Sequence, residues 1–322
     1  MKQKTAVVIP CYKVKDHIAN VISGIPEHIE KIYCIDDACP ENSGQFITDN
    51  LKDKRVHVIT HDVNQGVGGA VVSGYRQAIA DGYDIAVKVD GDGQMDPALI
   101  PVFVKPLEEG ACDYAKGNRF FYIEDVRAMP FIRLFGNAGL SFLTKLSSGY
   151  WHVFDPTNGY TAVNLNVLKQ IPLDKIAKRY FFESDMLFRL NLMQAVVQDI
   201  PMKAVYQGET SNLAISKIFL PFLWGHFRNF CKRVFYNYFL RDFSVASIEL
   251  LLSIPLLLFG IIFGASQWRI SIEAGVEASA GTVMLSALPI IIGTQFLLSF
   301  LNHDISTVPR TPLHKKLAER EK

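Results

Sequence analysis

Apolar and polar positions follow two alternating patterns along the first part of the chain. Short β-rich runs recur between longer stretches with helical periodicity. This alternation predicts right-handed βαβ crossovers and an α/β fold built on a mainly parallel sheet, Rossmann-like in outline. The predicted strands are TAVVIP (5–10), KIYCID (31–36), RVHVIT (55–60), DIAVKVD (84–90) and CDYAKG (112–117), and predicted helices include 68–81 and 97–109.

Beyond residue 118 the strand pattern loosens. The segments 129–149 and 179–195 have helical periodicity, and DPTNGYTAV (155–163) is typical of a turn that leads into a strand. From 212 to 243, aromatic residues are mixed with cations. That mixture favours helices lying in a membrane interface, with a plain linker as the alternative.

Two apolar runs near the C-terminus have the length of membrane spans. Ser247 to Ser266 carries one charge, Glu249, and Gly281 to Leu301 carries none. About 20 residues of helix cross a hydrocarbon core of ~30 Å. The alternative is a buried helical hairpin inside a large soluble core. The predicted organisation is a large α/β domain at 1–211, juxtamembrane helices at 212–244, a two-helix hairpin at 245–302 and a basic tail at 303–322.

Charge and cysteine content narrow the setting. With 33 basic and 32 acidic residues, the net charge of +1 gives no reason to expect nucleic-acid binding. The five cysteines form no CxxC pair, which indicates reduced thiols in the cytosol, and the N-terminus lacks a signal-peptide pattern. Flanking cations predict that both termini and the large domain face the cytoplasm. These cations are Arg228, Lys232, Arg233 and Arg241 before the first span and Arg310, Lys315 and Lys316 after the second, whereas the connector has only Arg269.

The sequence VKVDGDGQMDP ends a predicted strand in an acidic turn. Asp90 and Asp92 are two residues apart, so both carboxylates can face one ion, and Gln94 is a further oxygen donor. Hard oxygen ligands suit Mg²⁺ or Mn²⁺ bound together with a substrate diphosphate, and Gly91 lets that diphosphate approach the backbone. An EF-hand is excluded because Met95 stands where that loop requires glycine.

Two further motifs lie near strand ends. Asp36 and Asp37 close the second strand, and ligands of such sheets bind at the carboxyl ends of the strands. The glycine-rich turn from Asn64 to Tyr75, with Gly68, presents backbone N–H groups to a phosphate or, alternatively, serves tight helix–strand packing. It lacks the GK[ST] of a P-loop and the last glycine of GxGxxG, so kinase-type and nicotinamide chemistry fit poorly.

Six motifs in order, VVIPCYK, CIDDACPENSG, NQGVGGA, VDGDGQMDP, GNRF and DPTNGYTA, resemble family 2 glycosyltransferases. With two C-terminal spans, the chain is similar to the polyprenol-phosphate sugar transferases, the branch that includes dolichol-phosphate mannose synthase. The resemblance implies a GT-A-type fold and inverting, metal-dependent transfer of a hexose from a nucleotide-diphosphate sugar to polyprenyl phosphate at the cytoplasmic membrane face. The QxxRW element of processive synthases is missing, which predicts transfer of one sugar per acceptor. UDP-glucose and undecaprenyl phosphate are the first expectations, and a homo-oligomer stays open.

The resemblance also assigns residues. Asp90, Asp92 and Gln94 would hold the metal, and Pro10, Tyr12, Asp36 and Asp37 would line the nucleoside pocket. Arg119 and Arg133 would grip the acceptor phosphate, a task suited to guanidinium groups. The chemistry of the transfer leaves three further candidates: Asp155 as the base if one is needed, and Glu183 and Asp185 to orient sugar hydroxyls or the acceptor. Alternatively, Glu183 and Asp185 pair with Arg179 or Arg189.

Two rival functions remain open at this stage. One keeps the donor site but uses a protein or glycan acceptor. The other is a non-catalytic membrane adaptor that binds nucleotide sugars.

Overall fold

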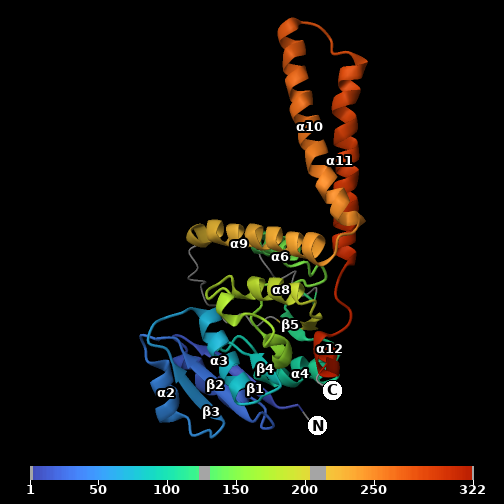
Figure 1. Cartoon of the computed structure of the whole chain (residues 1–322). Coiled ribbons are helices and arrows are strands. Elements are labelled where there is room, and N and C mark those ends of the chain that lie inside the picture. Colours follow the sequence, from blue (N-terminus) through green and yellow to red (C-terminus); the bar gives the residue numbers. More distant parts are fainter. Residues whose placement is uncertain (1–2, 123–130, 204–214, 321–322) are drawn as a thin grey trace. The chain divides into compact units, whose positions relative to one another are not determined.

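The computed structural model describes residues 3–122, 131–203 and 215–320, without the side chains of 132, 133, 215–218 and 320. The chain forms two compact units (Figure 1). One comprises residues 1–231 together with 309–322, and the other comprises residues 232–308. The second unit is therefore an insertion into the sequence of the first.

A seven-stranded sheet organises the first unit, with strand order β3-β2-β1-β4-β6-β5-β7. All neighbouring pairs are parallel except those of β6, which runs antiparallel to both β4 and β5. The mainly parallel α/β fold expected from the sequence is thus confirmed. The strands are β1 (Thr5–Cys11), β2 (Lys31–Asp36), β3 (Val56–Thr60), β4 (Ile85–Lys88), β5 (Tyr114–Asn118), β6 (Thr161–Asn164) and β7 (Val197–Pro201).

Helices connect and cover the strands. In the first unit these are α1 (Lys15–Gly24), α2 (Ser43–Asn50), α3 (Val67–Ala80), α4 (Ile100–Glu108), α6 (Phe131–Ser148), α7 (Leu165–Leu168) and α8 (Phe182–Leu192), with short turns η1 (Pro97–Leu99) and η2 (Leu173–Lys175). The apolar core lies on the sheet, where Phe103 of α4 stacks on Tyr160 with 4.1 Å between ring centroids. On α3, a Cβ at Gly74 would lie 2.3 Å from Val8, so this glycine lets the helix pack closely on β1.

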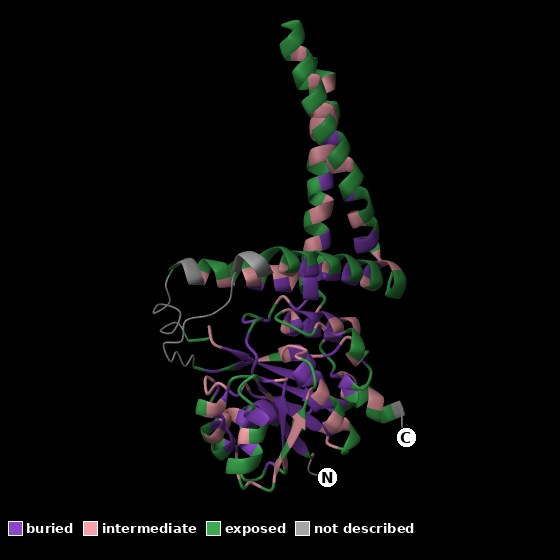
Figure 2. Ribbon diagram, turned by 90° about the vertical axis from the view of Figure 1, so that its left-hand side faces the viewer, coloured by how far each residue is buried: buried purple, intermediate pink, exposed green. Residues whose placement is uncertain are grey.

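The long helix α9 (Ile215–Phe235) lies mostly within the first unit and packs one face on its other elements. Asn229 Nδ2 donates to Asp185 Oδ1 at 3.0 Å, and His226 Nδ1 lies 2.8 Å from Ser147 Oγ of α6. Much of the remaining helix surface is exposed (Figure 2). The exposed residues include the large apolar Trp224 and Phe227. This arrangement is that of an amphipathic helix, as the mixture of aromatic and basic residues predicts.

The second unit contains the π-helical turn η3 (Tyr236–Arg241) followed by a helical hairpin. The hairpin consists of α10 (Val245–Ala274) and α11 (Ala280–Ser306), which lie side by side (Figure 1). Small residues permit this contact, since a Cβ at Gly260 would lie 2.6 Å from Ile290. Both helices are long and apolar enough to cross a bilayer, and only 22% and 11% of their apolar windows are buried. A helical hairpin buried in a soluble core would have most of that surface covered, so the exposure disfavours that alternative.

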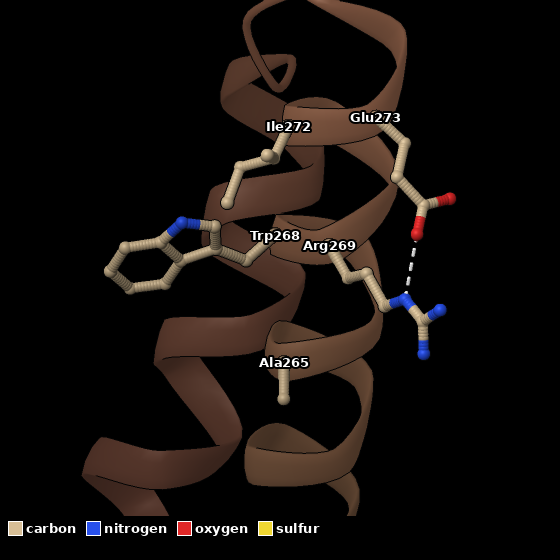
Figure 3. A pocket seen from close by; sticks show the side chains of 5 residues that line it. All are labelled: Ala265, Trp268, Arg269, Ile272 and Glu273. Atoms are coloured by element: carbon tan, nitrogen blue, oxygen red, sulfur yellow. Dashed lines mark hydrogen bonds and ion pairs between the residues drawn. The ribbon is translucent and has the colours of Figure 1, made fainter.

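Two local features of this unit stand out. Arg233 and Asp304, both 2% exposed, form a two-point ion pair with NH1–Oδ1 2.5 Å and NH2–Oδ2 3.0 Å, and Tyr238 also donates to Asp304. A hollow of about 380 Å³ lies along α10 and is lined by Ala265, Trp268, Arg269, Ile272 and Glu273 (Figure 3). The hollow contains none of the residues that the sequence predicts to be functional.

The C-terminal segment, residues 309–322, belongs to the first unit. The backbone amides of Leu313 and His314, at the start of α12 (Leu313–Arg320), donate to the carboxylate of Asp113 at 2.7 and 2.9 Å. His314 Nδ1 lies 2.6 Å from the same carboxylate, which is fully buried. The sequence predicted a basic tail here, and the structure shows a docked helix.

Candidate functional site

The acidic turn follows β4 at the carboxyl edge of the sheet. Its shape is set locally, since Gln94 N donates to Asp92 Oδ1 at 3.0 Å and Gly93 has φ +79°, a conformation that favours glycine. Gly91 packs against the core, because a Cβ there would lie 3.2 Å from Val14 and 3.3 Å from Ile9. The turn thus holds Asp90, Asp92 and Gln94 close together.

A buried lysine lies directly behind this turn. Lys88 Nζ is 2.8 Å from Asp90 Oδ1 and 3.4 Å from Glu183 Oε1, and it donates to the carbonyl of Gly159 at 3.1 Å. Burial favours the neutral amine, but the charges of Asp90 and Glu183 outweigh it and raise the pKa of Lys88. Lys88 was not among the residues predicted from the sequence, although a single lysine within an apolar strand indicates a buried cation paired with a carboxylate.

The donor set of the turn fits a hard divalent cation. Asp90 keeps 26% of its side chain exposed although Lys88 holds one of its oxygens. Two carboxylates and one amide supply oxygen ligands, which suit Mg²⁺ or Mn²⁺ and leave positions for substrate phosphate. Among residues 3–122, 131–203 and 215–320 no group of three or more His, Cys, Asp and Glu side chains is placed to hold a metal alone.

The residues expected around the nucleoside lie at the ends of β1 and β2. Tyr12 is 47% exposed and follows β1, which contains Pro10. Asp36 is buried and accepts the amides of Cys39 and Gly44 at 2.7 and 2.5 Å, so it shapes the loop after β2.

Asp37 connects this region to the glycine-rich turn. Its carboxylate lies 2.7 Å from His61 Nδ1 and accepts the amides of Gln65 and Gly66 at 2.8 and 2.7 Å. Its carbonyl also accepts from Asn64 Nδ2 at 3.1 Å. The carboxylate is itself buried and holds the start of the glycine-rich turn in place.

Gly68 supports the packing interpretation of the glycine-rich turn. A Cβ there would lie 2.4 Å from the carbonyl oxygen of Ala177 and 2.7 Å from Phe182. The amide of Gly69 donates to the carbonyl of Lys178 at 3.1 Å. The glycines thus let α3 approach the segment before α8.

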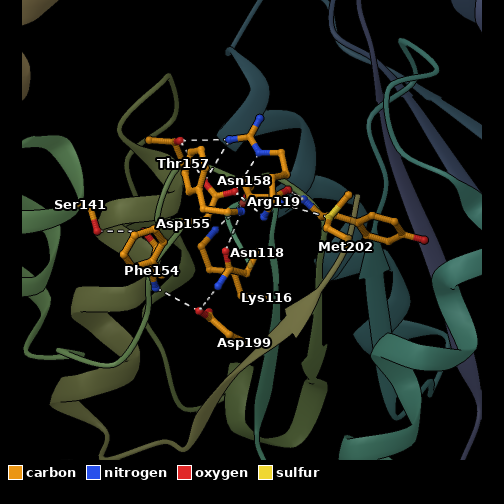
Figure 4. Close-up of polar contacts among 12 residues, drawn as sticks. Lys116, Asn118, Arg119, Ser141, Phe154, Asp155, Thr157, Asn158, Asp199 and Met202 are labelled. Atoms are coloured by element: carbon orange, nitrogen blue, oxygen red, sulfur yellow. Dashed lines mark hydrogen bonds and ion pairs between the residues drawn. The ribbon is translucent and has the colours of Figure 1, made fainter. Parts of the chain in front are cut away.

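Directly after β5 lies an arginine held by a buried carboxylate (Figure 4). Arg119 Nε donates to Asp155 Oδ2 at 2.8 Å and NH2 donates to Oδ1 at 3.0 Å, while the Arg119 amide donates to Oδ2 at 3.1 Å. Asp155 is fully buried and Arg119 remains 28% exposed. This geometry favours Asp155 as the residue that orients Arg119. Arg133 lies on α6, and its side chain is outside the described residues.

Beneath this pair lies a polar network on β5 and β7. Asp199 Oδ2 accepts from Asn118 Nδ2 and from the amide of Phe154, both at 3.0 Å. Burial raises the pKa of Asp199. Lys116 is fully buried, donates to the carbonyl of Asn158, and has its pKa lowered to about 8 by burial. None of these residues was singled out from the sequence.

Glu183 and Asp185 separate in space although they share α8. Glu183 reaches Lys88, at the back of the acidic turn. Asp185 is fully buried, accepts the amide of Ala177 at 2.9 Å and pairs with Arg189 Nε at 2.9 Å. Asp185 therefore ties together α8, the preceding segment and α9, which agrees with the structural alternative for this residue.

The site gathers acidic and basic side chains at one edge of the sheet, an arrangement that suits a phosphorylated ligand. An acidic turn and nucleoside-side loops lie at the carboxyl edge of a mainly parallel sheet, with an arginine beside them. The glycosyl transferase family 2 model matches residues 6–171, just over half of the chain. The chain belongs to this family and is a glycosyltransferase, as the six ordered motifs predicted.

Named relatives share the expected branch. The chain is 30% identical over 214 residues to a UDP-N-acetylglucosamine–dolichyl-phosphate N-acetylglucosaminyltransferase of Methanococcus voltae, covering 62% of this chain and 85% of the relative. It is 26% identical over 206 residues to an undecaprenyl-phosphate mannosyltransferase of Micrococcus luteus, covering 63% and 84%. It is 28% identical over 192 residues to polyprenol monophosphomannose synthase of Mycolicibacterium smegmatis, covering 58% and 72%.

Solved structures agree on the fold. Glucosyl-3-phosphoglycerate synthase from Mycobacterium tuberculosis, in complex with Mn²⁺, UDP and glucosyl-3-phosphoglycerate, superimposes with a TM-score of 0.52 at 18% identity. The match covers 72% of this chain and 80% of that one. At this identity the likeness establishes the GT-A-type fold.

Proposed function

We propose that this protein transfers a single hexose from a nucleotide-diphosphate sugar to polyprenyl phosphate at a membrane surface. The observation that carries the proposal is the placement of two opposite kinds of phosphate-binding group at one sheet edge. The acidic turn at Asp90 and Asp92 suits a cation-bound diphosphate, and Arg119, oriented by Asp155, suits a phosphate monoester. The acceptors named for the relatives support this choice.

On the donor side, Asp90, Asp92 and Gln94 would hold Mg²⁺ or Mn²⁺. The bound ion supplies charge stabilisation for the departing nucleotide diphosphate. Pro10 and Tyr12 would contact the nucleoside, while Asp36 and Asp37 keep the surrounding loops in shape. A UDP-sugar is proposed as the donor because one relative is named for UDP-N-acetylglucosamine. Among UDP-sugars, UDP-glucose is tested first.

On the acceptor side, Arg119 and Arg133 would bind the phosphate of the lipid. An oxygen of this phosphate attacks the anomeric carbon, and the bond from that carbon to the donor diphosphate breaks with its electron pair. The configuration at the anomeric carbon is thereby inverted. A phosphate monoester has a second pKa near ~6, so the attacking oxygen needs no base at neutral pH. Positioning by Asp155 and Arg119 is then the main task of the protein.

The helical elements would bring the site to its lipid substrate. The exposed aromatic face of α9 suits the headgroup region, and α10 and α11 suit a hydrocarbon core. In this proposal the hairpin crosses the cytoplasmic membrane and both termini face the cytoplasm.

The proposal is tested by a donor screen on the full-length protein in detergent. Radiolabelled UDP-glucose, UDP-N-acetylglucosamine and GDP-mannose are each incubated with undecaprenyl phosphate and Mn²⁺ or Mg²⁺. The expected result is organic-extractable label with one donor, dependent on the lipid phosphate. Label that transfers equally well without lipid phosphate would instead indicate a protein or glycan acceptor.

A further inference from the structure

Two buried lysines occupy matching positions on either side of β6. Lys88 of β4 is paired in register with Thr161, and Thr161 is paired with Lys116 of β5. Residues directly opposite one another on neighbouring strands point to the same face of a sheet. Both ammonium groups therefore emerge on one face, separated by a single strand.

The two lysines hold consecutive carbonyl groups. Lys116 donates to the carbonyl of Asn158, and Lys88 donates to the carbonyl of Gly159 at 3.1 Å. The fit is tight, since a Cβ at Gly159 would lie 2.3 Å from Lys88 Nζ and 2.7 Å from Asp90 Oδ2. The backbone of residues 155–159 is thus fixed from both sides.

This loop connects the two halves of the site. At one end, Asp155 fixes Arg119 by two side-chain contacts and one backbone contact. At the other end, the ammonium of Lys88 also contacts Asp90 and Glu183. A continuous series of contacts therefore runs from the acidic turn to the arginine.

Simple packing does not account for the choice of lysine. Burying an ammonium costs free energy unless it is paired, and an apolar side chain of similar length would fill a sheet position without that cost. Both positions nevertheless carry lysine, and both ammonium groups donate a hydrogen bond to the same five-residue loop.

We infer that Lys88 and Lys116 are positioning residues that hold the 155–159 loop rigidly between the donor turn and the acceptor arginine. The inference rests on the proposed function, which assigns the acidic turn to the sugar donor and Arg119 to the acceptor phosphate. Lys116 acts through Asn158 and Asp155 on Arg119, whereas Lys88 acts on both the loop and Asp90.

Binding and kinetics separate the two roles. In Lys116→Met we expect the KM for undecaprenyl phosphate to rise about tenfold, because a charge-assisted hydrogen bond is lost. The dissociation constant of UDP, measured by calorimetry with Mn²⁺, stays within about twofold of wild type. In Lys88→Met both quantities rise. A general loss of stability would not produce this division between donor and acceptor.

A double-mutant cycle tests the path. If Lys116 acts through Arg119, then Lys116→Met and Arg119→Ala are non-additive in their effect on the acceptor KM. Additive effects, or an unchanged acceptor KM in a folded Lys116→Met, would overturn the inference.

Two further measurements keep the inference testable if a lysine variant fails to fold or no transfer is found. Gly159→Ala retains both charges but displaces the Lys88 ammonium and the Asp90 carboxylate, which a Cβ there would meet at 2.3 and 2.7 Å, and it should weaken UDP binding. Gly281→Ala should not, since a Cβ there would meet only Ser279 Oγ at 3.8 Å. Hydrogen exchange at the Arg119 amide needs no substrate. It should accelerate about tenfold or more in Lys116→Met if the loop loosens. Unchanged exchange would contradict the inference, and failure of the donor screen alone would contradict only the proposed function.

Discussion

The guanidinium of Arg119 and the carboxylate of Asp155 meet in a two-point contact of 2.8 and 3.0 Å, with the carboxylate fully buried and the guanidinium partly exposed. A buried carboxylate that accepts three hydrogen bonds from one arginine is suited to orienting that arginine. The first prediction follows from this relationship.

In Asp155→Asn, the charge that fixes Arg119 is lost while the volume is kept. We expect the KM for polyprenyl phosphate to rise by roughly ten- to a hundredfold, since hydrogen bonds to charged groups contribute about 1.5–3 kcal/mol. Nucleotide binding should not change. The matched control is Asp174→Asn, which removes an exposed carboxylate–arginine pair with Arg76. Steady-state kinetics that show equal losses in both variants would contradict the assigned role.

Metal dependence should follow the acidic turn. Removal of divalent ions with EDTA, or Asp92→Asn, is expected to reduce transfer about a hundredfold or more and to abolish the Mn²⁺-dependent part of UDP binding. Calorimetry with and without Mn²⁺ provides the measurement. Asp49→Asn, on the exposed face of α2, is the control and should behave as wild type. Full Mn²⁺-dependent binding in Asp92→Asn would place the ion elsewhere.

Because the pKa of Lys116 is lowered, we expect the free energy of unfolding to rise at alkaline pH. Burial lowers its pKa to about 8 from the ordinary value of 10.5, which the unfolded chain retains. Between these values the unfolded chain binds a proton that the folded protein does not, so the free energy of unfolding increases with pH. Relative to Lys116→Met, wild type should gain stability as pH rises from 8 to 10.5. Urea unfolding across this range measures the difference, and the exposed Lys105→Met should show a flat difference.

Because Asp113 binds the start of α12, we expect the C-terminal helix to contribute to the stability of the first unit. Burial alone would raise the pKa of this carboxyl, but hydrogen bonds from His314, Val196 and Leu313 outweigh it and lower the pKa. Its contribution to stability is therefore present above the ordinary carboxyl pKa and is lost as pH falls through the lowered value. Asp113→Asn should reduce the free energy of unfolding by about 3 kcal/mol at neutral pH, because buried amides lose a charged acceptor.

Thermal or urea unfolding checks this expectation. Truncation after residue 308 should have a similar effect, and the exposed Asp62→Asn should have none. If both Asp113→Asn and the truncated chain unfold at the wild-type midpoint, the helix contributes nothing to the stability of the unit.

The predicted membrane orientation can be read by thiol labelling. Cys231 is the exposed native cysteine among the five and is first replaced by serine. Single cysteines are then introduced at Glu277, between the spans, and at Glu319, on α12. In intact cells an impermeant maleimide should label the Glu277 site and leave the Glu319 site unlabelled until the membrane is opened. The reverse pattern would contradict the positive-inside assignment.

The sequence allowed β1, β2 and β4 to be predicted because buried parallel strands leave continuous apolar runs. β3 and β5 were predicted from β-rich composition, although β3 has no buried residue and β5 contains Lys116. It did not reveal β7, whose segment Val197–Pro201 is short and includes Gln198 and Asp199. Nor did it predict that β6 lies antiparallel between β4 and β5, since strand order depends on pairing between distant segments.

In the candidate site, too, local features could be predicted from the sequence and contacts between distant residues could not. The acidic turn could be predicted because its three oxygen donors lie within five residues. Lys88 and Lys116 could not be assigned roles, because their carbonyl partners are 71 and 42 residues away in the sequence. Asp113 meets His314 across 201 residues, a contact that no local pattern records.

The most direct test of the central claim is the transfer assay with purified full-length protein, labelled UDP-sugar, undecaprenyl phosphate and Mn²⁺, run beside Asp92→Asn and Arg119→Ala. The proposed function predicts label in a lipid-phosphate-linked product for wild type and a loss of about a hundredfold in each variant. Lipid-linked label formed equally well by all three proteins, or by none of them with any nucleotide sugar, would contradict it.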